Sequence, residues 1–167
     1  MSLGERPKAQ SLIESNTATR EETHGEHAWA IWPATCSVDA VTVQLNHTIV
    51  RVRSKEESAT FLAEILGLPD PTPFGPFMVV QAANEVSLDF ADDHGAPNPQ
   101  HYAFLVSEPE FDEIFGRIRE RGLPYWADPF KRRPGEFNTN DGGRGVYWED
   151  PSGHFLEIIT RPYGSCS

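Results

Sequence analysis

The sequence predicts an α+β fold built from two tandem βαβββ modules that form a cup-shaped mixed sheet, and three observations support it. First, two strand-like stretches align with each other, LNHTIVRV (45–52) and PQHYAFLV (99–106). Second, each stretch is followed by a helix signal, and both helix signals end in the tripeptide Gly-Leu-Pro. Third, a later pair of stretches also aligns, VSLDF (86–90) with HFLEI (154–158). An internal repeat explains all three observations at once.

Residues 1–42 precede the repeat and differ from it in composition. They are rich in Glu, Thr, Ser and Ala, and no helical or strand period persists, so we expect a flexible extension. Only HAWAIWPATC (27–36) is apolar enough to dock on the domain. His24 and His27 have no further ligands nearby in the sequence, and we interpret them as solvated histidines rather than a metal site.

The first module is expected over about residues 43–95. After its opening strand, the capping box Ser54-Lys55-Glu56-Glu57 starts a helix. Apolar residues repeat along one face of this helix at Phe61, Leu62, Ile65 and Leu66. Gly67 suits the left-handed position that ends a helix, and the proline two residues later prevents its continuation. Short strands are expected near 77–82 and 86–91, with a bridging segment before them.

The second module is expected over about residues 98–162 and repeats this order. Its helix starts with the capping box Ser107-Glu108-Pro109-Glu110 and ends at Gly122. The apolar face of that helix is formed by Phe111, Ile114, Phe115 and Ile118. Strands are expected near 125–128, 145–149 and 154–160. The residues that the second module has in excess fit the loop 130–143.

Four ionisable side chains share one face of the predicted sheets. Side chains alternate along a strand, so packing the apolar positions on the helices turns His47, His101, Asp89 and Glu157 toward the uncovered face. A carboxylate within an apolar strand such as HFLEII costs free energy unless it has a partner. We expect the four to converge inside the cup. There, two imidazoles and one or two carboxylates would bind a divalent ion such as iron, manganese, nickel, cobalt or zinc.

Composition excludes several classes of partner. The chain has 14 basic against 25 acidic residues, a net charge of −11, and no long basic run, which argues against nucleic acid or an anionic membrane surface. No stretch reaches the roughly 18 apolar residues of a membrane span, and no secretory signal is visible. Cys36 and Cys166 fit neither a zinc knuckle nor a redox pair, so we expect reduced thiols in a cytoplasmic protein.

The stretches LNHTIVRV, HYAFLV and GRGVYWEDPSGHFLEI resemble the vicinal oxygen chelate superfamily, over about residues 43–162. That superfamily includes glyoxalase I, fosfomycin-resistance thiol transferases, extradiol dioxygenases and bleomycin-resistance proteins. The resemblance implies His47, His101 and Glu157 as metal ligands, while Asp89 stands where glyoxalase I has a fourth. It also implies a homodimer, whose modules pair within one chain or are exchanged between two.

The resemblance further implies a metal-dependent enzyme that acts on a small oxygen-chelating substrate. We favour a lyase or isomerase over an extradiol-type dioxygenase, because no histidine lies between His101 and His154 to act as acid or base. Glu157 or Asp89 would move the proton, and Tyr147 would lie beside the metal. A non-catalytic protein that binds a small molecule or confers drug resistance is the alternative from a different class.

Substrate recognition is expected from the loop 130–143, between the predicted strands near 125–128 and 145–149 of the second module. Lys131-Arg132-Arg133 is the only dense basic cluster in an acidic chain, and it would bind a carboxylate or phosphate. We predict Arg132, Asn138, Asn140 and Arg144 as substrate-binding residues. The alternative is that this stretch is a solvated surface loop.

Overall fold

A computed structural model describes residues 43–165 of the chain. In chain order its elements are β1 (His47–Val52), α1 (Lys55–Leu66), β2 (Thr72–Phe74), β3 (Phe77–Gln81), β4 (Ser87–Asp92), β5 (His101–Leu105), α2 (Glu108–Glu120), β6 (Tyr125–Trp126), a 3₁₀ turn η1 (Asn140–Gly142), β7 (Gly145–Glu149) and β8 (Phe155–Ile159). This order confirms the two predicted βαβββ modules. The predictions for 1–42, including His24, His27 and Cys36, and for Cys166 lie outside the described residues.

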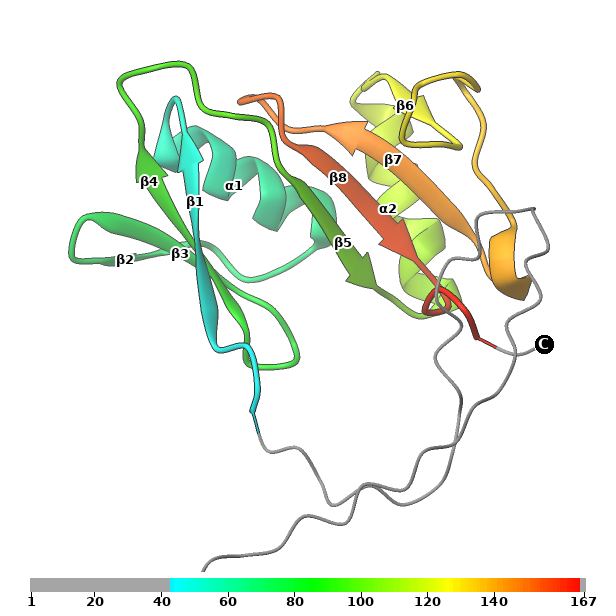
Figure 1. Cartoon of the computed structure of the whole chain (residues 1–167), viewed down its shortest axis with the longest axis horizontal. Coiled ribbons are helices and arrows are strands. Elements are labelled where there is room, and N and C mark those ends of the chain that lie inside the picture. Colours follow the sequence, from blue (N-terminus) through cyan, green and yellow to red (C-terminus); the bar gives the residue numbers. More distant parts are fainter. Residues whose placement is uncertain (1–42, 166–167) are drawn as a thin grey trace, which may run out of the picture. The chain divides into compact units, whose positions relative to one another are not determined.

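Each module contributes one four-stranded sheet, with strand order β1-β4-β3-β2 in the first and β5-β8-β7-β6 in the second (Figure 1). The first pair of each sheet is parallel and the remaining pairs are antiparallel, so both sheets are mixed. The register also repeats, since His47 lies opposite Ser87 and His101 lies opposite Phe155. The α+β class is therefore confirmed.

Capping residues set where the two helices begin. The side chain of Ser54 accepts a hydrogen bond from the Glu57 backbone, and Ser107 and Glu110 form a reciprocal capping box. Such caps each contribute about 1 kcal/mol. At the far end of α1, Gly67 has φ of 72°, a left-handed conformation in which a side chain would be strained. The bounds predicted from these signals are thus confirmed.

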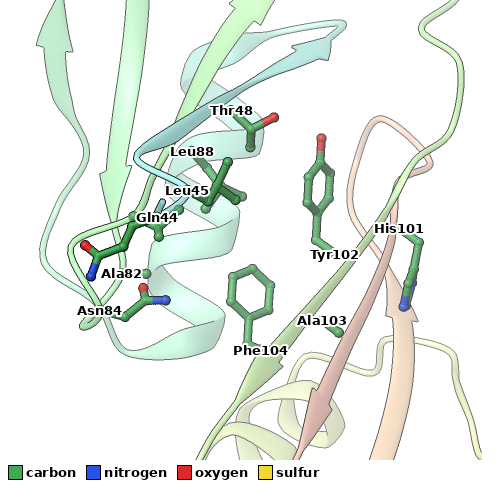
Figure 2. Close-up of a pocket in the computed structure, with 11 residues that line it drawn as sticks. Gln44, Leu45, Thr48, Ala82, Asn84, Leu88, His101, Tyr102, Ala103 and Phe104 are labelled. Atoms are coloured by element: carbon green, nitrogen blue, oxygen red, sulfur yellow. The ribbon is translucent and has the colours of Figure 1, made fainter. Parts of the chain in front are cut away.

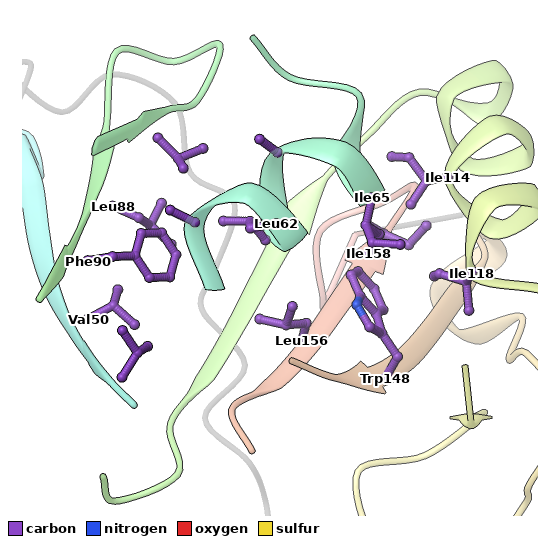
Figure 3. Close-up of a cluster of buried hydrophobic side chains, with 14 of the residues drawn as sticks. Val50, Leu62, Ile65, Leu88, Phe90, Ile114, Ile118, Trp148, Leu156 and Ile158 are labelled. Carbon is purple, nitrogen blue, oxygen red and sulfur yellow. The ribbon is translucent and has the colours of Figure 1, made fainter. Parts of the chain in front are cut away.

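One apolar core serves both modules, as Figure 3 shows. Leu62 and Ile65 on α1 belong to the same buried cluster as Ile114 and Ile118 on α2. The cluster is completed from the sheets by Val50, Val52, Val80, Leu88, Phe90, Val146, Trp148, Leu156 and Ile158. Because the two helices also pack on each other, neither module has a core of its own.

A tight turn between β7 and β8 ties the modules together by hydrogen bonds. His154 is buried, its Nδ1 accepts from the backbone N–H of Gln100 at 3.0 Å, and its Nε2 lies 2.9 Å from the carbonyl oxygen of Arg51. Since a carbonyl only accepts, Nε2 carries the proton. Ser152 in the same turn accepts from the backbone of Arg53 at 3.0 Å. The turn therefore joins the second module to the end of β1.

The loop 130–143 is held by its own hydrogen bonds rather than by long strands. The carboxylate of Asp128 accepts from the backbone N–H groups of Phe130, Arg132 and Arg133. These bonds lower the pKa of Asp128, although partial desolvation is the largest single influence and opposes them. The strand predicted near 125–128 is shorter than expected, because the chain turns at Asp128. Within 43–165, no helix is long and apolar enough to cross a membrane.

Candidate metal centre

His101 and Glu157 form a close pair on the open face of the second sheet. They lie on the neighbouring parallel strands β5 and β8, and His101 Nε2 is 3.2 Å from Glu157 Oε2. The Glu157 side chain is fully buried, whereas that of His101 is 47% exposed. Leu156 and Ile158, on either side of Glu157, belong to the core. The alternation inferred from the sequence therefore holds for this pair.

The hydrogen bond on the other side of the His101 ring fixes its tautomer. Nδ1 lies 3.0 Å from the carbonyl oxygen of Phe155, which can only accept, so Nδ1 carries the proton. Nε2 of the neutral ring then presents a lone pair to the Glu157 carboxylate. Two acceptors 3.2 Å apart repel each other unless a proton or a cation lies between them.

This donor set fits a divalent metal ion. Metal–nitrogen and metal–oxygen distances of about 2.0–2.2 Å place two adjacent ligands of one ion about 3.0–3.5 Å apart. The observed separation of 3.2 Å between Nε2 and Oε2 lies in that interval. Metal-bound histidines also characteristically donate their second ring N–H to a carbonyl or carboxylate, as His101 does here.

Two tyrosines complete the surroundings of Glu157. Tyr163, on the segment after β8, donates its hydroxyl to Glu157 Oε1, and its oxygen is 2.7 Å from that of Tyr147. Tyr147 lies opposite Glu157 on β7, and its ring stacks on that of His101 at 5.9 Å. Burial and the nearby carboxylate raise the pKa of Tyr163 to about 12 and that of Tyr147 further. Both phenols are therefore protonated at neutral pH.

Sequence reasoning had selected Tyr147 but missed Tyr163. Tyr147 lies on a strand at a position that pairs with Glu157, so its facing followed from alternation. Tyr163 lies beyond the last strand, in a turn where no periodicity indicates the direction of a side chain. The only signal in the sequence is the pair Pro162 and Gly164, which predicts a turn close to Glu157.

His47 and Asp89 lie at a second, separate place, in the first module. Both line a hollow of about 490 Å³ on that module, together with Ser87 and the rim of β2 and β3. Asp89 Oδ1 accepts from the hydroxyl of Ser87 at 2.8 Å, and His47 Nδ1 lies 2.9 Å from Asn46 Oδ1. Because an amide oxygen only accepts, His47 also has Nε2 available as a ligand.

The four predicted residues do not converge within one chain. Among residues 43–165, no group of three or more His, Cys, Asp or Glu side chains is placed to hold a metal ion. We expected one cup, but the modules are joined through α1, α2 and the turn around His154, on the side that the helices cover. The uncovered face of each module therefore carries two of the four residues, and the expected convergence is absent from residues 43–165.

A hollow of about 610 Å³ lies between the modules but does not contain the Glu157 carboxylate. Figure 2 shows Tyr102 and Phe104 directed toward Thr48 and Leu88 across it, and His101 is also among the residues that line it. Tyr102 and Phe104 pack against the apolar core. This hollow therefore lies beside the core and borders His101, but Glu157 is not among its lining residues.

The residues predicted to bind substrate have partners within the protein. Arg144 pairs with Glu108 and Asp112 at 2.6 Å each, and its guanidinium lies 4.3 Å from the centre of the Phe111 ring. Asn138 is buried and donates to the carbonyl of Ala127 at 3.0 Å. These contacts favour a structural role for Arg144 and Asn138, and their substrate-binding role stays a prediction.

The other two predicted residues also have local contacts. Asn140 donates its backbone N–H to Asn138 Oδ1 at 3.2 Å, and the Arg132 guanidinium lies 4.9 Å from the centre of the Phe130 ring. Neither contact involves His101 or Glu157. For these residues, too, substrate binding stays a prediction.

Lys131 is the member of the basic cluster that reaches the open face of the second sheet. Its Nζ lies 4.8 Å from the centre of the Trp126 ring and 5.5 Å from that of Phe155, and it pairs with Glu149 at 2.5 Å. Phe155 in turn stacks on Tyr147 at 5.4 Å. A row of rings therefore runs from His101 through Tyr147 and Phe155 to a cation, which the sequence did not reveal.

Comparison with known proteins adds evidence on ancestry. No family model matches the chain. The solved structure of Oxidase ChaP-H1 is 70% identical, covers 74% of this chain and 100% of its own, and superposes with a TM-score of 0.73. Glutathione transferase FosA of Serratia marcescens is 29% identical over 120 residues, which are 68% of this chain and 78% of that protein. Metallothiol transferase FosB of Shouchella clausii (strain KSM-K16) is 25% identical over 121 residues, 70% of this chain and 79% of that protein.

Proposed function

Because the chain belongs to the vicinal oxygen chelate superfamily, we propose that it is a metal-dependent oxidase acting on a small oxygen-chelating substrate. The observation that carries this proposal is the 70% identity to Oxidase ChaP-H1 along the whole of that chain. The similarity to the glutathione transferase, at 29%, is much lower. The lyase or isomerase that we favoured from the sequence becomes the second candidate.

The two tyrosines remove the main objection to an oxidative function. We favoured a lyase because the second module has no suitable histidine to act as acid or base. Tyr147 and Tyr163 instead place protonated phenols beside Glu157, with 2.7 Å between their oxygens. A phenol donates a hydrogen bond to a developing oxyanion and can supply a proton. Tyr147, our predicted catalytic residue, would serve this role by turning its hydroxyl from Tyr163 toward the substrate, with its ring held by His101 and Phe155.

His47, His101 and Glu157 would hold the divalent metal ion. When bound, such an ion supplies Lewis acidity and, if it is iron, one-electron chemistry toward a substrate that chelates it through neighbouring oxygens. The chain's own contribution is orientation, because the hydrogen bond to the Phe155 carbonyl holds the His101 ring with Nε2 directed at Oε2 of Glu157. Asp89 stays a candidate for proton transfer or for a fourth ligand.

A second copy of the chain would complete the site. One module offers His47 and the other offers the His101–Glu157 pair, yet the described part of one chain brings no three ligands together. An assembly in which the first module of one copy faces the second module of the other would supply all three ligands, twice by symmetry. We therefore propose a homodimer with exchanged pairing, one of the two arrangements that the sequence left open.

Metal analysis followed by oxygen uptake tests the function. The protein is purified without chelators, its metals are quantified by mass spectrometry, and a metal-free sample is reloaded with Fe²⁺, Mn²⁺, Ni²⁺, Co²⁺ or Zn²⁺ in turn. Each form is then assayed for oxygen consumption with a panel of catechols and hydroxyquinones, with His101→Ala as the control. We expect one ion per chain and oxygen uptake that depends on a redox-active metal and disappears in His101→Ala.

Two results would contradict the oxidase proposal. The first is a protein that binds stoichiometric metal, consumes no oxygen, and turns over the glutathione hemithioacetal of methylglyoxal. This result would establish the lyase instead. Absence of metal both as purified and after reloading would favour the non-catalytic binding protein.

A further inference from the structure

We propose that Tyr163 is a positioning residue that holds Glu157 by Oε1, so that the carboxylate binds its metal through Oε2 alone. The inference rests on the metal site proposed above and assigns a task to a residue outside the predicted set. Tyr163 lies on the segment that follows β8, and this segment is not part of the repeated βαβββ unit.

The two carboxylate oxygens of Glu157 have different partners. Oε2 lies 3.2 Å from Nε2 of His101, the lone pair that would bind the same ion. Oε1 instead accepts the hydroxyl of Tyr163. A carboxylate can bind a metal through one oxygen or both. Because Tyr163 uses Oε1, the geometry favours one-oxygen binding and leaves a coordination position for substrate.

The Tyr163 hydroxyl is itself held in place. An ionised carboxylate only accepts, so Tyr163 donates to Glu157 and accepts from Tyr147, 2.7 Å away. Tyr147 is 5% exposed and sits on β7 with its ring against His101 and Phe155. The buried Tyr147 hydroxyl therefore orients the hydroxyl of the more exposed Tyr163.

The backbone after β8 also positions the ring. The backbone N–H of Ser165 donates to the carbonyl of Pro162 at 3.2 Å, which closes a turn around Tyr163. Gly164 in that turn has φ of 74°, a conformation that other residues adopt only with strain. Tyr163 is nevertheless 56% exposed, so removing its hydroxyl would disturb little packing. Its contribution is therefore directed at Glu157 rather than at the core.

The test compares Tyr163→Phe with wild type and with Tyr102→Phe, in the full-length protein loaded with Co²⁺. Tyr102→Phe is a matched control, since it also removes one phenol hydrogen bond, from Tyr102 to Gln100, away from Glu157. Affinity is measured by titration calorimetry and coordination by the visible absorption of Co²⁺. We expect Tyr163→Phe to lower the affinity about 10–100-fold, as loss of an outer hydrogen-bond partner typically does. The cobalt spectrum should change as Oε1 becomes free to bind.

The alternative outcomes are distinct. If wild type and Tyr163→Phe bind Co²⁺ with the same affinity and spectrum, Tyr163 has no positioning role, although the metal site stands. If wild type binds no Co²⁺, the proposed metal site itself fails. Should Tyr163→Phe not fold, Gly164→Val keeps the phenol but strains its turn. It should change the spectrum in the same way, and an unchanged spectrum would overturn the inference.

Discussion

The first and second modules share one scaffold but differ in how completely each builds its pair of polar side chains. In both, a strand that opens the module lies parallel to the strand that closes it, and the acid on the closing strand stands two residues after the partner of the histidine that begins the opening strand. In the second module the acid is Glu157, fully buried, with partners on both oxygens. In the first it is Asp89, 9% exposed and bonded to Ser87 on its own strand.

The difference shows what the second module has gained from segments outside the repeat. The loop 130–143 supplies Lys131 to the open face, and the residues after β8 supply Tyr163. The first module has no counterpart to either and leaves His47 beside an open hollow. In our proposal, Tyr163 preorganises Glu157 in the second module to bind a metal ion, whereas the first module would contribute one ligand to a site completed elsewhere.

The largest effect should come from the acids that occupy equivalent positions. We expect Glu157→Gln to reduce metal affinity at least about 100-fold, since loss of a direct ligand exceeds the cost of losing an outer partner. Asp89→Asn should reduce it only a few-fold, because Asp89 is shorter and already accepts from Ser87. Calorimetric titration with Mn²⁺ measures both. Equal losses of metal affinity in the two variants would mean that Asp89 is a direct ligand. The two modules would then not differ in their contribution to the site.

The shared core predicts that the modules unfold together. Leu62 on α1 is 2% exposed and belongs to the cluster that contains residues of both sheets. Leu62→Ala should lower the free energy of unfolding by about 2–5 kcal/mol. Thermal unfolding followed by calorimetry should still show a single transition, shifted to lower temperature. If two transitions were resolved and the substitution shifted only one of them, the modules would unfold independently.

The turn around His154, which joins the modules, should contribute less to the free energy of unfolding than the core residue Leu62 does. His154→Leu removes bonds to Gln100 and to the carbonyl of Arg51 and leaves both backbone groups without these partners. The expected loss is about 1–3 kcal/mol. Ser58→Ala is a milder comparison, because it removes one hydroxyl contact with Ser152 across the same junction. Urea unfolding monitored by tryptophan fluorescence measures both, and a larger loss in Ser58→Ala would contradict this assignment.

The smallest effect is expected at Arg144, and it should depend on pH. Hydrogen bonds lower the pKa of Glu108, from Thr160 first and Arg144 second, and Arg144 lowers that of Asp112. Lowered carboxyl pKa values stabilise the fold above the unfolded pKa of about 4, and this stabilisation is lost as pH falls through the folded values. Arg144→Gln should therefore lower the unfolding temperature by roughly a few degrees at pH 7 and less at pH 3. Metal affinity should not change; a large loss of substrate binding would restore our original prediction.

Much of the fold and the proximity of His101 to Glu157 followed from the sequence. The repeat, the caps and the alternation of HFLEII correctly placed Glu157 on the open face beside His101. The alternation of side chains along a strand tells which face of its own sheet a residue lies on. It carries no information on how two sheets are oriented relative to each other. For that reason the expected convergence with His47 was not found in the chain.

The remaining differences have the same origin. Arg144 and Asn138 lie in an irregular segment, where contacts depend on tertiary structure, and their polar character alone suggested substrate binding. Tyr163 contacts Glu157 through a turn that follows the last strand, which no period could indicate. Irregular segments near a site therefore have to be assigned from contacts rather than from patterns.

Mixing two inactive variants tests the central claim most directly, that His47 of one copy joins His101 and Glu157 of another. His47→Ala and His101→Ala are each purified with a different tag, shown to bind little Mn²⁺, and then mixed under conditions of subunit exchange. Random pairing makes half of the dimers mixed, and each mixed dimer has one intact site, so about one quarter of the wild-type metal content should return. If mixed dimers form, as dual-tag capture would show, but bind no more metal than the separate variants, the ligands do not come from two chains.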